Sequence, residues 1–315
     1  MRKFLAYAAI YILWGGSFLA IREIVTLVPP FFAAGFRFLF AGLILILWSR
    51  VTGSFAFTLR QFLNAALLGL IMFAFLYAGL FWAETRIPSG VASVVSALIP
   101  LWIYAGEVLF LRTQRLTLLS FSGIALGFMG VAVLALGNPG HHGHVRGYIS
   151  AIAVTVLGTL CWGIGTILSR RLDLPSPQKL NAGWQMYTGG LLLMIAAFAR
   201  GERSMLPADW VLVSPRVLLS MAYLIVAASI IAYTCYVWLI AHDSPTRVSS
   251  YAYVNPVIAL LLGVSLAGEQ LSRRQLAGAA LVVVGVAATL MGKRPPRAKD
   301  EDPRPQRKIS TAGLR

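Results

Sequence analysis

The chain has 315 residues, 58% of them hydrophobic and only 12% charged, so most of it cannot form the surface of a soluble protein. Lys and Arg number 27 and Asp and Glu 11, which gives a net charge of +16. Such an excess would suit nucleic acid, but the basic residues are spread over short polar segments and a C-terminal tail. Membrane topology explains that distribution better. We therefore expect membrane lipid as the surroundings and no nucleic-acid partner.

Apolar runs follow one another along the whole chain, each close to the roughly 20 residues that a helix needs to cross a hydrocarbon core of about 30 Å. They do not alternate in polarity as barrel strands do, and a helix satisfies its own backbone in lipid. The predicted fold is all-α, a polytopic membrane protein with ten transmembrane helices. The ten runs are 4–22, 30–48, 62–82, 88–110, 117–137, 147–168, 182–199, 216–240, 246–267 and 273–292.

Basic residues predict the orientation of these helices. With the N-terminus inside, 18 of the 27 Lys and Arg residues fall on cytosolic segments and 8 on outer loops, as the positive-inside rule requires. We expect a multi-pass protein of the inner (plasma) membrane with both termini cytosolic. The tail, residues 293–315, has eight basic residues, four prolines and little apolar content, so it is expected to be a disordered cytosolic segment.

The two halves of the chain repeat one pattern. We expect a first five-helix repeat at 1–137, an outer linker at 138–146 and a second five-helix repeat at 147–292. Because five is odd, the second repeat must cross the bilayer in the opposite sense, the inverted-repeat arrangement of many secondary transporters. The matched residues are Trp14 with Trp162, Arg37 with Gln185, Tyr77 with Tyr233, Pro100 with Pro256, Gly123 with Gly278 and Gly130 with Gly285.

Five short segments carry a family pattern: Tyr11 to Ser17, Arg37 to Ala41, Pro88 to Ala92, Ser250 to Pro256, and Gly268-Glu269. They resemble the EamA family of the drug/metabolite transporter superfamily, over about residues 4 to 292. The resemblance implies a ten-helix carrier with a central cavity between the halves, exporting amino acids or other small metabolites.

The first half departs from the family pattern at the end of its fourth run. The family often has a Gly-Glu pair there, whereas this chain has Arg112-Thr113-Gln114. The acid survives only as Glu269, which puts in doubt any role that needs it in both halves.

Two prolines lie near the middle of predicted helices. Pro100 and Pro256 have no N–H to bond the carbonyl four residues back, at Ser96 and Ala252, so each is expected to bend its helix and free a carbonyl. Matched breaks in two halves point to a binding site, and we interpret both prolines as gating kinks. A packing kink without substrate contact is the alternative.

Small polar side chains recur at helical spacing around these prolines, and aromatic residues match between the halves. Such residues suit a cavity, although small residues also mark ordinary helix packing and aromatics ordinary cores. Asn255 is an amide near mid-membrane, suited to a substrate or interhelical hydrogen bond. The candidate substrate-binding or cavity residues are Trp14, Ser17, Arg37, Tyr77, Ser93, Ser96, Trp162, Gln185, Tyr233, Ser250, Tyr253 and Asn255.

Three charged residues within or next to the predicted helices are candidates for function. Arg37 is seven residues into the second run, where it either binds a substrate carboxylate or bonds neighbouring helices. Glu84 and Glu107 are candidate proton carriers, and a plain charged pair with Arg86 or Arg112, respectively, is the alternative.

Motifs for nucleotide or metal chemistry are lacking in the sequence. His141, His142 and His144 cluster in an outer loop without an acid or cysteine beside them, which favours a solvated linker, so we expect no metal, no cofactor and no catalytic residue. The predicted function is a secondary transporter of a small metabolite, an amino acid or related amphipathic compound, exporting by alternating access. Protons are a candidate coupling ion, and a monomer or homodimer is expected. A membrane-embedded enzyme and an oligomeric channel are the alternatives.

Overall fold

The computed structural model describes residues 1–53, 55–136, 145–205, 214–243 and 248–294. Within them, nine helices are long and apolar enough to cross a membrane, and a tenth apolar helical stretch, Val254–Ala267, is shorter. The described residues form no strand, only one isolated bridge between Ala56 and Ser176. The predicted all-α fold of ten helices is confirmed.

Several of the ten spans consist of two or three helical segments. The segments are α1 (Arg2–Gly15) and α2 (Ser17–Val25); α3 (Pro30–Val51); α4 (Leu59–Leu68), η1 (Gly69–Phe75) and α5 (Leu76–Glu84); α6 (Ser89–Ser96), α7 (Ile99–Gly106) and η2 (Glu107–Leu111); α8 (Leu118–Ala135); α9 (Val145–Ser169); α10 (Gln178–Ala199); the short η4 (Glu202–Met205); α11 (Pro215–Tyr223), η6 (Leu224–Ile231) and α12 (Ala232–His242); α14 (Tyr251–Ala267); and α15 (Arg273–Met291).

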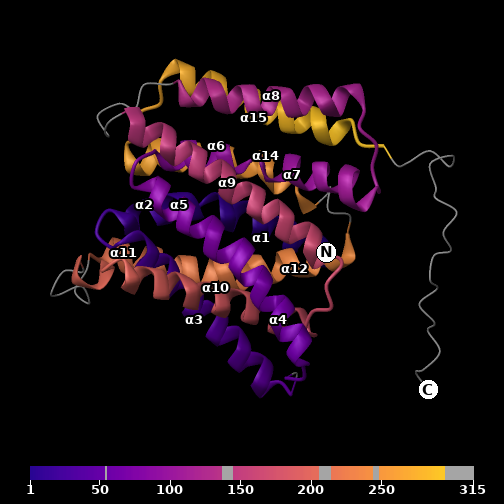
Figure 1. The fold of residues 1–315 in the computed structure, drawn as a ribbon. Helices are drawn as coiled ribbons and strands as arrows, with labels where there is room; N and C mark the ends of the chain where they lie inside the picture. The colour runs from indigo at the N-terminus through magenta and orange to yellow at the C-terminus, as the bar shows by residue number, and fades with distance from the viewer. Residues whose placement is uncertain (54, 137–144, 206–213, 244–247, 295–315) are drawn as a thin grey trace, which may run out of the picture.

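Equivalent helices of the two halves pack against each other in antiparallel fashion. In the α8–α15 pair, Gly123 lies against Gly285 and Gly130 against Gly278, so the residue order runs in opposite directions. A Cβ added to Gly285 would lie 2.4 Å from the backbone nitrogen of Gly127, which shows how closely the two backbones approach. The α3–α10 pair is packed through glycines in the same way, and both pairs are seen in Figure 1. This antiparallel pairing is what an inverted repeat predicts.

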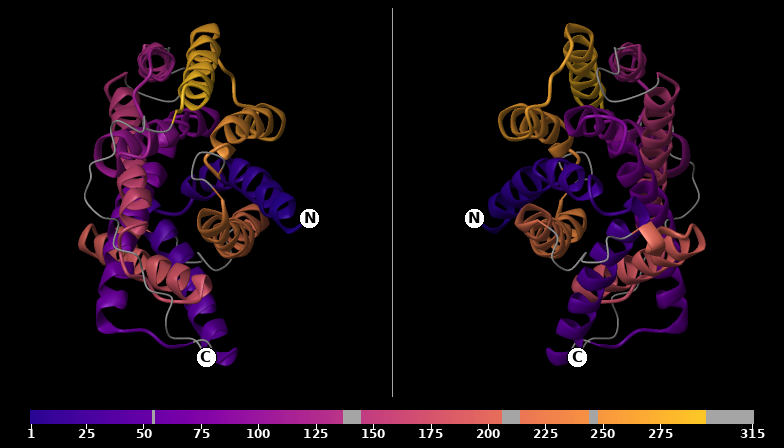
Figure 2. Two further views of the ribbon diagram at one scale, coloured as in Figure 1. Left: turned by 90° about the vertical axis from the view of Figure 1, so that its right-hand side faces the viewer. Right: turned by 90° about the vertical axis from the view of Figure 1, so that its left-hand side faces the viewer.

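The remaining helices exchange partners between the halves. Helix α1 packs against α12 and α14, and its equivalent, α9, packs against α5 and α6. Helices α6 and α14 also contact each other, so residues from both halves meet at the centre of the bundle. Figure 2 shows the bundle from two sides, with α1, α12 and α14 facing α9 across its middle.

The third and eighth spans are each interrupted by π-helical turns, η1 and η6, at equivalent positions. Such turns are commonly found at functional sites. The wider winding also changes which carbonyls bond within the helix, and Ala228 in η6 accepts a hydrogen bond from the indole N–H of Trp14 at 3.0 Å.

The breaks near the two prolines differ from the prediction. In the first half the helix ends at Ser96 and resumes at Ile99, so Pro100 lies in the first turn of α7, where its missing N–H costs nothing. In the second half α14 continues through Pro256. A helix interruption therefore accompanies Pro100 but not Pro256, while the bend, the free carbonyl and the gating role of each proline stay predictions.

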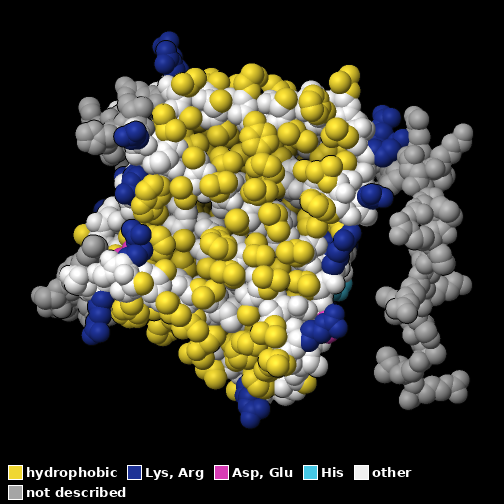
Figure 3. Space-filling view, in the orientation of Figure 1, with side chains coloured by type: hydrophobic (Ala, Val, Ile, Leu, Met, Phe, Trp, Pro, Cys, Tyr) yellow, Lys and Arg dark blue, Asp and Glu magenta, His cyan; other side chains and the backbone are white. Residues whose placement is uncertain are grey.

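The surface carries an apolar band bordered by charge. On the face shown in Figure 3, hydrophobic side chains cover the middle and Lys and Arg residues gather along two opposite edges. The start of α1 and the end of α15 lie at one of these ends of the bundle, and the C-terminal ends of α5 and α14 lie at the other (Figure 1). We call these ends of the bundle the terminal side and the far side, respectively.

Candidate functional site

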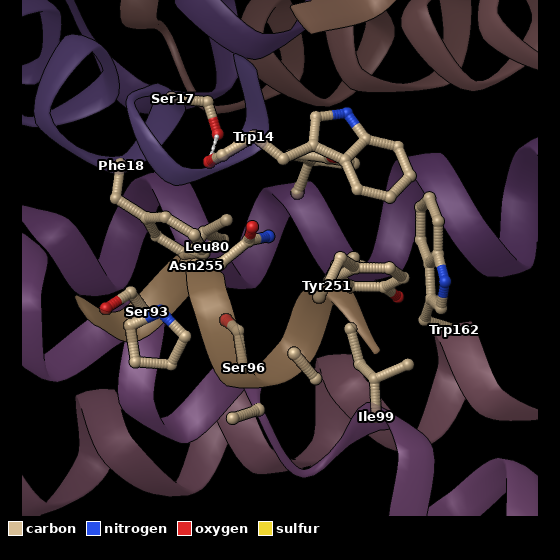
Figure 4. A pocket seen from close by; sticks show the side chains of 15 residues that line it. Trp14, Ser17, Phe18, Leu80, Ser93, Ser96, Ile99, Trp162, Tyr251 and Asn255 are labelled. Atoms are coloured by element: carbon tan, nitrogen blue, oxygen red, sulfur yellow. Dashed lines mark hydrogen bonds between the residues drawn. The ribbon is translucent and has the colours of Figure 1, made fainter. Parts of the chain in front are cut away.

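A cavity lies at the centre of the bundle, about midway along the spans, where both halves contribute walls. Its volume is about 50 Å³, on a measure by which one water needs about 10–15 Å³, so it holds a few waters but no metabolite in this conformation. Figure 4 shows its labelled side chains. The lining residues are Trp14, Ser17, Phe18, Leu76, Tyr77, Leu80, Ser93, Ser96, Ala97, Ile99, Trp162, Tyr251, Ala252, Asn255 and Pro256.

Seven of the predicted cavity residues therefore line one space: Trp14, Ser17, Tyr77, Ser93, Ser96, Trp162 and Asn255. Pro256, predicted as a kink, lines it too. Among the described residues, no charged side chain does so. A cavity with apolar walls and a few polar groups is the usual form of a small-molecule site.

Aromatic rings form the terminal-side wall of the cavity. Trp14 and Trp162, equivalent residues of the two halves, meet edge to face with ring centroids 6.1 Å apart. Tyr251 lies 5.0 Å from Trp14 and Tyr236 lies 5.2 Å from it. The indole N–H of Trp162 and the hydroxyl of Tyr251 are both buried and make no hydrogen bond of normal geometry.

The small polar residues of the cavity bond their own backbone. Ser17 donates to the carbonyl of Trp14, and Ser93 and Ser96 donate to the carbonyls of Gly90 and Ala92, at 2.7–2.8 Å. Their oxygens keep lone pairs that can accept from a ligand.

The amide of Asn255 connects two helices. With its nitrogen turned toward them, it donates to the carbonyls of Tyr11 and Tyr251 at 3.1 and 3.2 Å. The Asn255 side chain thus joins α14 to α1 beside the cavity.

Two equivalent polar pairs flank the cavity. Arg37 is only 1% exposed, donates from Nε to Ser229 at 2.9 Å and lies 5.1 Å from the ring centroid of Tyr77. In the other half, Tyr233 donates to the amide oxygen of Gln185 at 2.6 Å. Arg37 does not line the cavity, and it reaches that space only through Tyr77. One of its terminal nitrogens, Nη1, makes no hydrogen bond.

Gln185 and Tyr233 line a second, larger space that opens on the terminal side. This vestibule has a volume of about 370 Å³ and is also lined by Arg170, Asn181 and Tyr236, among other residues. Tyr236 contacts Trp14 and Trp162 as well. A layer of aromatic rings thus separates the vestibule from the central cavity.

The far side of the cavity is closed by buried polar groups. Every residue from 87 to 100 is buried, and the carboxylate of Glu269 accepts the backbone N–H groups of Ser89 and Gly90 at 2.7 and 3.2 Å. Helix α6 has no side-chain cap of its own, so an acid from the other half supplies it. We call this contact the far-side seal.

Glu84 adjoins the far-side seal. The guanidinium of Arg22 donates to its backbone carbonyl, while its own carboxylate is fully buried and makes no hydrogen bond. The alternative pairing with Arg86 is wrong, because the Arg86 guanidinium bonds the carbonyl of Trp82 instead.

Glu107 is paired with Lys293 at 2.8 Å, not with Arg112. Arg112 has left-handed backbone angles, φ 54° and ψ 30°, and the chain turns away there. Burial lowers the pKa of Lys293, against the opposing effect of Glu107. Lys293, the first residue of the predicted tail, is therefore packed against the bundle, and the carbonyl of the exposed Arg294 accepts the N–H of Arg115 at 3.0 Å.

The other predicted residues lie elsewhere. Ser250 shares a hydrogen bond of 2.6 Å with the hydroxyl of Tyr11 and does not line the cavity. Pro100 is buried behind it in α7. The side chain of Tyr253 and the loop with His141, His142 and His144 lie outside the described residues, and the described part holds no cluster that suits a metal.

Sequence reasoning missed several apolar walls of the cavity. Phe18, Leu80, Ile99 and Tyr251 line it, yet each lies in an apolar run that reads as ordinary core. For Tyr251 a signal existed, since it belongs to the same segment as Asn255.

Two inverted halves around a shared central cavity define the molecule as a polytopic all-α membrane protein. The model of the EamA-like transporter family matches the chain twice, at residues 3–136 and 149–291. The chain belongs to this family.

Several relatives match along nearly the whole chain. The "Uncharacterized inner membrane transporter YedA" of Escherichia coli K12 is 36% identical over 291 residues, which are 91% of this chain and 90% of that protein. The "Probable amino-acid metabolite efflux pump" of Salmonella typhimurium is 28% identical over 292 residues, 90% and 93% of the two chains. A protein crystal structure with 21% identity covers 92% of this chain and 98% of its own with a TM-score of 0.64, which shows a shared fold.

Proposed function

We propose that this protein is a secondary transporter that moves a small metabolite, an amino acid or a related amphipathic compound, out of the cell by alternating access. The membership in the EamA-like transporter family and the transporter names of its relatives support the class. The name of the Salmonella relative supports the substrate and the direction.

One observation carries the proposal: the central cavity, midway along the spans, takes its walls from both inverted halves. Inverted repeats that share a midplane site allow each half to rock against the other and expose the site to either side. The volume of about 50 Å³ then corresponds to a closed cavity that must widen to accept its substrate.

The two ends of the cavity differ, as a carrier between its open states requires. On the far side, the cavity is closed by the N-terminus of α6 and Glu269. On the terminal side, only aromatic side chains separate the cavity from the vestibule. Rotating rings is a smaller rearrangement than moving a capped helix. The terminal side, cytosolic by the distribution of basic residues, is the side from which substrate enters.

Counterflow into proteoliposomes tests the proposal. Vesicles preloaded with one amino acid from a panel and diluted into trace label of the same compound should accumulate label transiently and saturably. Asn255→Ala should raise the half-saturating concentration, whereas Ser265→Ala, an exposed change on the same helix, should not. An unsaturable, ohmic flux would identify a channel, and altered product an enzyme.

A further inference from the structure

A large apolar groove lies outside the central cavity, between α5 and α9. Its volume is about 540 Å³, and nine of its ten lining residues are apolar or glycine: Phe31, Phe75, Ala78, Gly79, Trp82, Val154, Leu157, Gly158 and Cys161. Phe75 and Leu157 are 56% and 60% exposed, so the groove opens away from the bundle. In a membrane protein that direction is the hydrocarbon core.

Glycines form the floor of the groove. A Cβ on Gly79 would lie 2.8 Å from Val154, and one on Gly158 would lie 2.9 Å from Leu76. Helices α5 and α9 therefore approach each other closely at the floor, and the larger side chains stand at the walls. The groove therefore runs between α5 and α9 with closely packed backbones at its floor and larger side chains at its walls, a shape that suits an extended acyl chain.

The tenth lining residue, Arg200, gives the groove a charged far-side end. Its guanidinium lies 4.8 Å from the ring centroid of Phe31, and that of Arg86 lies 3.9 Å from the ring centroid of Trp82. Both rings line the groove. Aromatic residues and arginines at this depth mark the lipid–water interface.

The two arginines are short of negative charge. Arg86 bonds only the Trp82 carbonyl and the Thr85 hydroxyl among the described residues. In the described part of the chain, Arg200 has one acid, Glu202, at 3.9 Å, and the other oxygen of that carboxylate accepts the N–H of Phe32. Partial burial and the charge of Arg200 both lower the pKa of Arg86, which shows that the two cations act on each other. A single anion between them would relieve that repulsion.

We infer that the groove binds an anionic phospholipid, with one acyl chain along α5 and α9 and the headgroup phosphate between Arg86 and Arg200. Guanidinium groups bind phosphate through paired N–H donors, and basic pockets at the ends of transmembrane helices select anionic headgroups. The apolar walls identify a lipid as the source of the phosphate, because free phosphate would leave the groove unfilled. This inference does not depend on the transported substrate.

A second groove on the far side provides a matched control. It is lined by Glu23 and Arg216 together with apolar residues, so it holds an acid as well as a base. Arg216→Gln therefore removes one far-side positive charge outside the inferred lipid site.

The test measures lipid retention by the purified full chain. Protein exchanged into mixed micelles with equal phosphatidylglycerol and phosphatidylcholine of identical acyl chains is analysed by native mass spectrometry. The wild type and Arg216→Gln should retain phosphatidylglycerol about tenfold over phosphatidylcholine, because two partly exposed ion pairs together supply a preference of that order. The double variant Arg86→Gln/Arg200→Gln should show no preference.

A groove-filling variant separates headgroup binding from a lipid site. Ala78→Phe leaves both arginines in place and fills the groove, so it should lower retention of both lipids. Equal retention of the two lipids by the wild type would overturn the inference, and so would an undiminished preference in the double variant. Displacement of phosphatidylglycerol by millimolar inorganic phosphate, or full retention by Ala78→Phe, would show that the arginines bind an anion without the groove, which equally overturns it.

Discussion

Removing the carboxylate of Glu269 should open the far side of the cavity. This side chain accepts the N–H groups of Ser89 and Gly90 and so joins the C-terminal end of α14 in one half to α6 of the other. Because the far-side seal spans the two halves, it can exist only while α6 and the end of α14 are together. Glu269→Ala thus destabilises the far-side-closed state without removing a contact of the far-side-open state.

The size of the effect follows from the two hydrogen bonds that the Glu269 carboxylate accepts. Hydrogen bonds to a charged group contribute about 1.5–3 kcal/mol each, and the low end applies because Glu269 is only half-buried and its second bond is long, at 3.2 Å. The longer bond, from the N–H of Gly90, contributes less than the first, about 0.5 kcal/mol. The net effect is about 2 kcal/mol, which corresponds to roughly a 30-fold shift toward the open state.

Cysteine labelling measures this shift. In a background where Cys161 and Cys235 are replaced by serine, Ser93→Cys places a thiol at the cavity wall. A membrane-impermeant maleimide applied from the far side should label it about 30-fold faster in Glu269→Ala, and by a smaller factor in Glu269→Gln, which keeps a neutral acceptor.

Ser265→Ala is the matched control, because Ser265 is exposed near the same end of α14 and bonds only within that helix. An unchanged labelling rate in a well-folded Glu269→Ala protein would refute the reasoning. An equal acceleration in Ser265→Ala would refute it as well.

Three further changes test other parts of the structure. Gly285→Val should prevent α15 from approaching Gly127 on α8 and cost about 2–3 kcal/mol or abolish folding, measured as a lowered melting temperature in detergent, while an unchanged melting temperature would contradict the close packing. Lys293→Met should leave the carboxylate of Glu107, which is 3% exposed, without its partner. The folded protein should lose about 3–5 kcal/mol of stability, seen as a lowered melting temperature. If the added change Glu107→Leu does not restore the melting temperature, loss of the ion pair is not the cause. Arg37→Gln introduces the residue found at the equivalent position of the second half. If the buried cation acts on the cavity through Tyr77, counterflow should fall much more than expression. Equal losses of counterflow and expression would indicate a packing role for Arg37.

The spans themselves could be predicted to within a few residues, since hydropathy alone decides which segments enter lipid. The third predicted run, 62–82, became Leu59–Glu84, and the sixth, 147–168, became Arg146–Ser169. The π-helical turns were not predictable, because they depend on which residues of neighbouring helices compete for the backbone carbonyls. Helix α14 also begins later than its apolar run, at Tyr251.

The repeat predicted which residues of the two halves are equivalent, but not whether equivalent side chains contact each other. Trp14 and Trp162 come together at the cavity, whereas the equivalent Tyr77 and Tyr233 line different spaces. Partners far apart in the chain could not be found from sequence spacing. The alternative considered for Glu107 was a pair with Arg112 at short spacing, and its actual partner is Lys293. Sequence spacing predicts contacts within one helix, and tertiary packing decides contacts between helices.

The parts that must move can be separated from the parts that cannot. In the α8–α15 and α3–α10 pairs the backbones touch through glycines, and a small separation would remove most of the dispersion attraction between them at once. The cavity, by contrast, is walled by α1, α2, α5, α6, α7, α9 and α14, and none of these belongs to the α8–α15 or the α3–α10 pair. These seven segments include both parts of the broken span α6–α7 and the elements that meet at Glu269. Opening the cavity at one end therefore requires the inner helices to tilt between two fixed outer pairs, with the breaks taking up the change in backbone angles.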